Sequence, residues 1–258
     1  MSARSSIKLP PRLLWGASRL AASSLGLVGA LRLDEWAGGV DGARTDRYVR
    51  RWANATLGSL SVEVHQAGQI ALPQRGLIVA NHRSFVDIPL LLSRFGGRLL
   101  SRADVADWPL LGWLAGIGGT LYVDRDSSHS GAGALRRIVS SLKQGHTVGV
   151  FPEGTTFTDD EVRPFLPGAF LAAARARVPI VPVGIAYAEP SACFGDESFA
   201  THATNLFALS RVEVGLVVGA PLSARGRIEA VADEARRAVQ ASVLDARSLL
   251  SLRGKESV

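Results

Sequence analysis

The stretch NHRSFVD at residues 81–87 follows directly after the apolar run GLIVA at residues 76–80. The run is short, branched and uncharged, which predicts a buried strand. His82 and Asp87 are five residues apart, so on one helix their side chains would point about 140° away from each other. They can meet only if His82 lies in the turn before a helix and Asp87 lies in its first turn, facing back. The stretch therefore predicts a strand–turn–helix unit that carries a His–Asp pair at the carboxyl end of the strand.

A histidine beside a carboxylate suits general-base chemistry. The histidine accepts a proton near neutral pH, and the carboxylate holds the imidazole in one tautomer and stabilises the imidazolium. Two plainer interpretations stay open for the pair taken alone. Asp87 could favour a helix N-terminus through the macrodipole, and His82 could be an ordinary loop histidine. The rest of the chain decides between these interpretations.

Further segments repeat the pattern of an apolar run beside characteristic polar residues. They are GTLYVDR at 119–125, TVGV followed by FPEGTT at 147–156, and VPIVPV at 178–183. Together with the His–Asp stretch, these blocks resemble the lysophosphatidate (1-acylglycerol-3-phosphate) acyltransferase family, the PlsC-like glycerolipid acyltransferases, and they stand in the family's order. The resemblance spans roughly residues 60 to 221. One block alone is a weak signal, whereas all of them in order at sensible distances are a strong one.

The resemblance implies transfer of a fatty acyl group from an acyl thioester, acyl-CoA or acyl-ACP, to the free hydroxyl of a lysophospholipid. The acceptor that we expect is 1-acylglycerol-3-phosphate, which would give phosphatidate. His82 is then the general base and Asp87 its partner. Because the substrate supplies the hydroxyl, no enzyme nucleophile is required. Ser84 lacks the surroundings of a Gly-x-Ser-x-Gly elbow, so we interpret it as a cap for the following helix.

The resemblance also assigns acceptor binding to Arg125, Glu153 and Gly154, with Thr155 beside them. Arginine suits a phosphate because its planar donors engage two oxygens, and glycine lets the backbone approach closely. Arg102 stands where the family commonly has lysine and could assist the phosphate or the thioester oxygen. The alternatives are a surface arginine at 102, an ion pair between Arg125 and a neighbouring aspartate, and a simple turn at the Pro-Glu-Gly-Thr segment.

One departure from the family bears on the acceptor. The family often has Phe-Lys-x-Gly after the Glu-Gly-Thr block, whereas this chain has FLPG at 165–168, with Leu166 at the lysine position and Arg163 nearby. A basic contact for the phosphate is missing, so a lyso-ornithine lipid or another acceptor without phosphate is an alternative. Two further alternatives are a thioesterase, with water as the acceptor, and a non-catalytic lipid-binding protein that kept the fold.

The composition narrows the class of protein. Of 258 residues, 47% are hydrophobic and 20% charged, which is typical of a packed globular protein. The single cysteine, Cys193, excludes an intramolecular disulfide and a cysteine-rich zinc site. The remaining histidines are scattered without ligand spacing, so we interpret each as a surface or core residue. We expect no metal, no cofactor and no nucleic-acid partner, because no zinc-finger spacing or aromatic-interleaved basic patch occurs.

The N-terminus is basic and apolar. Residues 1–33 contain five basic and no acidic residues, and so hold +5 of the net charge of +6. The uncharged stretch 20–31 is shorter than the roughly 20 residues of a spanning helix. A signal peptide is an alternative, weakened by Arg19 near the start of its apolar part. We expect an interfacial amphipathic helix on the cytoplasmic face of the inner membrane, anchored by Leu13, Leu14, Trp15, Leu20, Leu27, Val28 and Leu31.

Apolar periodicity predicts the remaining elements. The expected strands are 60–65 (at a sheet edge), 76–80, 98–101, 120–123, 147–151, 180–187 and 212–218; the expected helices are one after His82, one from 108, and 132–144, 168–177 and 228–252. Residues 189–209 show no clear period and are expected to be a loop or lid. Alternating strands and helices predict an α/β fold with a mixed, mostly parallel sheet of about seven strands. We expect a membrane-docking segment at 1–55 and an acyltransferase domain at 56–258.

Overall fold

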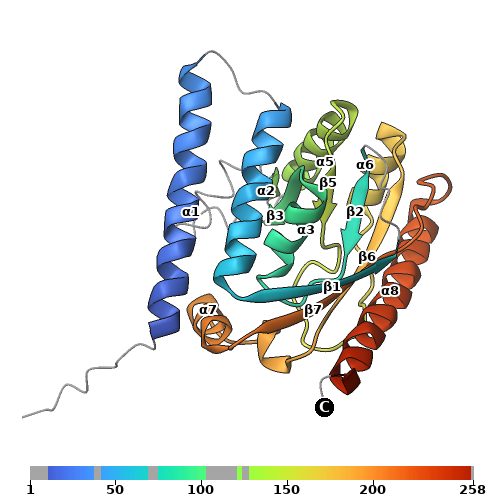
Figure 1. Cartoon of the computed structure of the whole chain (residues 1–258). Coiled ribbons are helices and arrows are strands. Elements are labelled where there is room, and N and C mark those ends of the chain that lie inside the picture. The colour runs from blue at the N-terminus through green and yellow to red at the C-terminus, as the bar shows by residue number, and fades with distance from the viewer. Residues whose placement is uncertain (1–10, 38–41, 69–74, 103–120, 124–127, 257–258) are drawn as a thin grey trace, which may run out of the picture.

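The computed structural model describes residues 11–37, 42–68, 75–102, 121–123 and 128–256, and Figure 1 shows how their helices and strands are arranged. The described strands form one seven-stranded sheet in the order β1-β7-β6-β2-β5-β3-β4. Neighbouring strands are parallel except for the antiparallel pair β6 and β7, so the expected α/β class with a mostly parallel sheet is confirmed. The strands are β1 (Val62–Gly68), β2 (Leu77–Ala80), β3 (Arg98–Arg102), β4 (Leu121–Val123), β5 (Val148–Val150), β6 (Ile180–Tyr187) and β7 (Val212–Val218).

Helices cover both faces of the sheet. The described helices are α1 (Pro11–Trp36), α2 (Gly42–Ser59), α3 (Asp87–Phe95), α5 (Ser128–Lys143), α6 (Gly168–Ala176), the 3-10 turn η2 (Pro190–Ala192), α7 (Phe199–Ala208) and α8 (Ile228–Glu256). In β2, Ile78 and Ala80 join the core under α1, α2, α3 and α7, whereas Leu77 and Val79 join the core under α5, α6 and α8. A strand buried on both sides must be apolar throughout, which explains the uninterrupted run at residues 77–80.

The strand β1 lies at the edge of the sheet, as the alternation at residues 60–65 predicted. It pairs in parallel with β7, from Val62 with Val212 to Gly68 with Val218. Two glycines, one in β6 and one in β7, let α8 lie directly on a face of the sheet. A Cβ at Gly184 would lie 2.1 Å from the Ser242 carbonyl carbon, and one at Gly215 would lie 2.4 Å from the Ala246 oxygen.

The prediction of a loop or lid at residues 189–209 is wrong, because this segment contains η2 and α7. The sequence pattern does not reveal α7, because only His202 and Leu206 are buried among its ten residues. Two buried residues leave no apolar period to detect. The start of α7 does carry a sequence signal, a serine at the N-cap position. Ser198 is an N-cap whose hydroxyl accepts from the Thr201 N–H at 3.2 Å, and serine is among the preferred residues at that position.

The two N-terminal helices pack side by side and antiparallel, as Figure 1 shows in blue. Two of the expected membrane anchors, Leu27 and Leu31, are instead buried in the core. The large apolar residues that α1 exposes are Leu14, Trp15, Leu25, Leu33 and Trp36. Trp52 of α2 is buried and donates its indole N–H to Ser24 at 3.1 Å. The domain boundary expected after residue 55 falls within α2. None of the described helices is both long and apolar enough to cross a bilayer.

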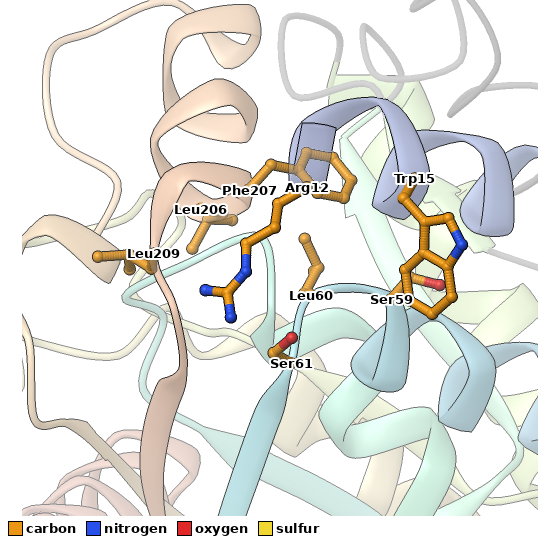
Figure 2. A pocket seen from close by; sticks show the side chains of 8 residues that line it. All are labelled: Arg12, Trp15, Ser59, Leu60, Ser61, Leu206, Phe207 and Leu209. Carbon is orange, nitrogen blue, oxygen red and sulfur yellow. The ribbon is translucent and has the colours of Figure 1, made fainter. Parts of the chain in front are cut away.

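The helix α7 contacts α1 directly. A Cβ at Gly16 would lie 2.7 Å from the Phe207 ring and 2.9 Å from the Ser59 carbonyl, so only glycine lets the helices approach this closely. Figure 2 shows a pocket of about 180 Å³ at this junction, lined by Arg12, Trp15, Ser59, Leu60, Ser61, Leu206, Phe207 and Leu209. The Arg12 guanidinium projects into it, close to where α2 and α7 both end. Since helix carboxyl ends carry partial negative charge, a cation is favoured there.

Candidate active site

The turn after β2 begins with a buried asparagine that fixes it to the sheet. The Asn81 amide donates to the Ile185 carbonyl at 2.8 Å and accepts from the Ile185 N–H at 2.8 Å. This two-way contact occupies both the donor and the acceptor of the side chain. It anchors the residue before His82 to the central strand β6. This anchoring role of Asn81 was not predicted from the sequence.

Asp87 is the first residue of α3, and its carboxylate faces back into the turn. The residue has no exposed surface. Its Oδ2 lies 2.8 Å from His82 Nδ1 and accepts from the backbone N–H groups of Arg83 at 2.6 Å and Ser84 at 2.8 Å. Its Oδ1 accepts from the Tyr187 hydroxyl at 2.6 Å. The carboxylate is therefore held by several donors, which offsets the free-energy cost of burying a charge.

His82 is held between this carboxylate and an aromatic ring. Its imidazole stacks on Phe151 with ring centroids 4.0 Å apart and an interplanar angle of 11°. An Asp87 acceptor at Nδ1 assigns the proton of a neutral ring to that nitrogen and leaves a lone pair on Nε2. The side chain is 19% exposed, so the ring is fixed on one side and reachable on the other. This is the geometry that a general base needs.

A second buried carboxylate, that of Glu153, joins the His82 turn to the loop after β5. Its Oε1 accepts from the His82 N–H and from the Arg83 guanidinium, each at 2.9 Å. Its Oε2 accepts from the Arg163 N–H at 3.0 Å. The Glu153 side chain is 0% and the Arg83 side chain 2% exposed. Arg83, which the sequence analysis did not single out, also donates to the carbonyls of Asp159 and Glu161.

The structure thus brings His82, Asp87 and Glu153 together. Gly154 follows Glu153 with φ of +85°, a conformation that favours glycine, and Thr155 beside it is exposed. Arg102 is the last residue of β3. Its side chain, like the whole of Arg125, lies outside the part of the chain that the structure describes.

Ser84 does not cap α3 in the expected way. Its hydroxyl accepts from the Val86 N–H at 3.3 Å and lies 3.2 Å from His202 Nε2, whereas α3 has no side-chain cap. The Asp87 carboxylate instead accepts from the backbone N–H groups of Arg83 and Ser84, in the turn before the helix.

Burial fixes the protonation of two neighbours of Asp87. The pKa of Tyr187 is raised well above 10, first by burial and then by the charge and hydrogen bond of Asp87, so its hydroxyl stays a donor. Burial, followed by the charge of Asp87, raises the pKa of the Cys193 thiol to about 11. The thiolate is the nucleophilic form of cysteine, so a protonated thiol is a poor nucleophile at neutral pH.

Comparisons with known proteins identify relatives of this chain. The family model described as Acyltransferase matches residues 61–186. A lyso-ornithine lipid O-acyltransferase of Pseudomonas aeruginosa is 35% identical over 240 residues, which are 89% of this chain and 92% of that protein. A chloroplastic 1-acyl-sn-glycerol-3-phosphate acyltransferase of Brassica napus is 30% identical over 166 residues, 64% of this chain and 45% of that protein.

A solved structure, the 1-acyl-sn-glycerophosphate acyltransferase of Thermotoga maritima, superposes with a TM-score of 0.71 over 92% of this chain and 95% of that one, at 20% identity. This likeness shows the fold. The fold and the sequence matches together are those of an acyltransferase. The chain belongs to the PlsC-type acyltransferase family, whose named members here act on lysophosphatidate and on lyso-ornithine lipids. The resemblance seen in the sequence blocks is confirmed.

Proposed function

We propose that the protein transfers a fatty acyl group from an acyl thioester to the free hydroxyl of a lyso-lipid, with His82 as general base and Asp87 as its partner. The observation that carries this proposal is the 2.8 Å contact between His82 Nδ1 and a fully buried Asp87. The hydroxyl is a poor nucleophile at neutral pH, so a base must take its proton during attack. The Nε2 atom of His82 takes that proton as the hydroxyl oxygen bonds to the thioester carbonyl carbon. The carbon–sulfur bond then breaks, and the leaving thiolate receives the proton from the imidazolium.

Glu153 has a different part in this proposal. Its carboxylate is fully buried and accepts from the His82 and Arg163 N–H groups and the Arg83 guanidinium, so we assign it to holding the turn rather than to contacting the acceptor. Gly154 and Thr155 follow it toward the surface, and we assign the acceptor headgroup to them and to Arg125 and Arg102. A backbone that turns at a glycine can bring its amides close to a bound anion.

For the acceptor we propose a lyso-ornithine lipid first and 1-acylglycerol-3-phosphate second, which reverses the order expected from the sequence alone. The relative from Pseudomonas aeruginosa aligns over nearly the full length of both chains. The Brassica napus enzyme aligns over 45% of its length. Leu166 stands at the position where the family often has a phosphate-binding lysine, and this also favours the lyso-ornithine lipid. The donor is an acyl-CoA or an acyl carrier protein thioester.

We further propose that α1 lies on the membrane surface through its outward apolar residues, on the cytoplasmic face where acyl thioesters are made. Leu14, Leu25 and Trp36 are each more than half exposed, and at 11-residue spacing they recur on one side of the helix because 11 residues make almost three full turns. Replacing all three by serine should reduce co-sedimentation with anionic vesicles. Unchanged sedimentation of the folded triple variant would contradict the placement.

The test of the reaction is thiol release from oleoyl-CoA, and in parallel from oleoyl-ACP, with lyso-ornithine lipid, 1-acylglycerol-3-phosphate or no acceptor. His82→Ala should lower acceptor-dependent turnover by about 10²- to 10⁴-fold. His146→Ala is the matched control. That histidine precedes β5 at the opposite end of the sheet and lies 3.4 Å from Arg98. Near-full activity of folded His82→Ala protein would overturn the general-base role.

The three acceptor conditions separate the remaining alternatives. Release that depends on lyso-ornithine lipid supports the proposed acceptor, whereas release that depends on 1-acylglycerol-3-phosphate keeps the mechanism and changes the substrate. Equal release without acceptor would indicate a thioesterase. No release that depends on His82 with either donor would favour a lipid-binding protein.

A further inference from the structure

The chain holds a buried histidine, His202, that the reaction above does not use. It lies in the middle of α7 with no exposed surface, and its ring stacks on Phe194 with centroids 4.6 Å apart. Burying an imidazole costs free energy unless its nitrogens find hydrogen-bond partners. The hydrogen-bond partners of His202 therefore indicate the role of the residue.

One nitrogen of His202 contacts the turn that carries the catalytic pair. Its Nε2 lies 3.2 Å from the Ser84 hydroxyl and 3.4 Å from the Phe85 backbone nitrogen. A backbone N–H can only donate, so Nε2 acts as the acceptor and Nδ1 carries the proton. The Nδ1 atom faces a Glu197 carboxylate oxygen at 3.3 Å, a charge contact without the alignment of a hydrogen bond. Burial lowers the pKa of His202 against the opposing effect of Glu197, which keeps Nε2 free to accept.

Ser84 connects this contact to Asp87. Its side chain meets His202, while its own backbone N–H donates to Asp87 Oδ2 at 2.8 Å. The same oxygen lies 2.8 Å from His82 Nδ1. A displacement of Ser84 would therefore move a donor away from the carboxylate that orients the base.

The helix that carries His202 is also held one turn further along. Leu206 is buried in the core, and Phe207 lies against Gly16 of α1, where no side chain could be added without a clash. Figure 2 shows both α7 residues in the lining of the small pocket, with the Phe207 ring next to α1. A side chain that positions a site must itself stand on a fixed element, and α7 provides one.

We propose that His202 is a positioning residue, which holds Ser84 and Phe85 so that Asp87 meets His82 in the reactive geometry. This inference rests on the proposed general-base role of His82. It adds a residue from α7 to a site built from the loops after β2 and β5, the start of α3 and the end of β6.

The test compares two substitutions, each of which keeps a different property of the histidine. His202→Phe keeps the bulk and the stacking on Phe194 but removes the acceptor, whereas His202→Gln keeps an amide oxygen that can accept. We expect His202→Phe to lower kcat by about 10- to 100-fold with KM nearly unchanged, as misplaced catalytic groups do. His202→Gln should recover most of kcat. Thr204→Ala, on the exposed side of the same helix, is the matched control.

Ser84→Ala removes the other partner of the same contact, and it provides the test if His202→Phe does not fold. Its effect on kcat and that of His202→Phe should not add in the double variant, because both remove one shared interaction. Additive effects, or equal kcat in folded His202→Phe and wild type, would overturn the positioning role. A kcat loss that glutamine and phenylalanine share equally would also overturn it, since that pattern means packing alone.

His82→Ala separates the two hypotheses. If His82→Ala is inactive while His202→Phe is fully active, the base assignment stands and only the positioning role fails. If His82→Ala is active, the proposed function itself fails.

Discussion

Two carboxylates at the ends of neighbouring strands have the same burial and opposite surroundings. Asp87 follows β2 and Glu153 follows β5, which pair in parallel, and neither side chain has exposed surface. Asp87 holds a histidine that is 19% exposed, whereas Glu153 holds an arginine that is 2% exposed. The side chain that each carboxylate holds indicates the role that we propose for it. We therefore assign the carboxylate behind a reachable imidazole to proton transfer, and the carboxylate in a closed ion pair to fixing the loops around it.

The largest effect should come from breaking the first pair with Asp87→Asn. The amide keeps the shape of the side chain but favours the wrong imidazole tautomer and no longer stabilises an imidazolium. We expect turnover to fall by about 10²- to 10⁴-fold, measured as acceptor-dependent thiol release. Thermal melting of the variant confirms that the protein is folded. Turnover within a few fold of wild type would remove Asp87 from the mechanism.

Glu153→Gln should act mainly on stability. Its neutral amide leaves the Arg83 guanidinium buried without a counter-charge, at a cost of about 3–5 kcal/mol in the free energy of unfolding. Denaturant unfolding measures this loss. Glu161→Gln is the control, since that carboxylate is 75% exposed and should change stability little. If Glu153→Gln unfolds like wild type and loses turnover as severely as Asp87→Asn, the contrast between the two carboxylates is wrong.

Tyr187→Phe tests how much the donors around Asp87 matter. It removes one hydrogen bond to a charged group, worth about 1.5–3 kcal/mol, and we expect turnover to fall by about tenfold. Because the folded pKa of Tyr187 lies above its unfolded value, the stability from this residue is complete below about pH 10 and is lost as the pH rises further. The stability difference between wild type and variant should therefore be constant below about pH 10 and shrink as the pH rises above that value. A constant difference would contradict the assignment, and Tyr48→Phe is the control.

The smallest effect should come from Leu166→Lys, which restores the lysine often present in the family. Leu166 is 48% exposed and its N–H donates to the Pro152 carbonyl at 2.9 Å, so the new charge would lie near the Glu153 loop. An exposed ion pair is worth up to about 1 kcal/mol. We expect the preference for 1-acylglycerol-3-phosphate over lyso-ornithine lipid to rise about fivefold in kcat/KM. The gain should vanish at high salt and be absent in Leu166→Gln.

The parts of the site that the sequence predicted are local. A five-residue spacing after an apolar run was enough to place Asp87 in the first turn of a helix facing His82, and the structure has that strand, turn and helix. The edge position of β1 also followed from the pattern within one strand. In each case a short stretch of chain contained all the interacting groups.

The parts that were missed cross the sheet. Tyr187 lies 100 residues from Asp87, and His202 lies 118 residues from Ser84. These contacts depend on β6 lying beside β2 and on α7 covering the turn, and neither follows from periodicity. Two of the expected apolar anchors of α1, Leu27 and Leu31, were misassigned for a similar reason. Only the packing of α1 against α2 and the sheet decides which of its leucines face inward.

The pairing of β1 with β7 also has a consequence for the order of events during synthesis. Val62 must find Val212, so the edge of the sheet forms across most of the length of the chain. Contacts this distant in sequence form slowly, and on the ribosome the chain emerges from its N-terminus. Until β7 has been made, β1 has no partner among the described strands. The α1 helix, with its outward apolar side chains, and the α2 helix therefore leave the ribosome before the sheet that they accompany can close.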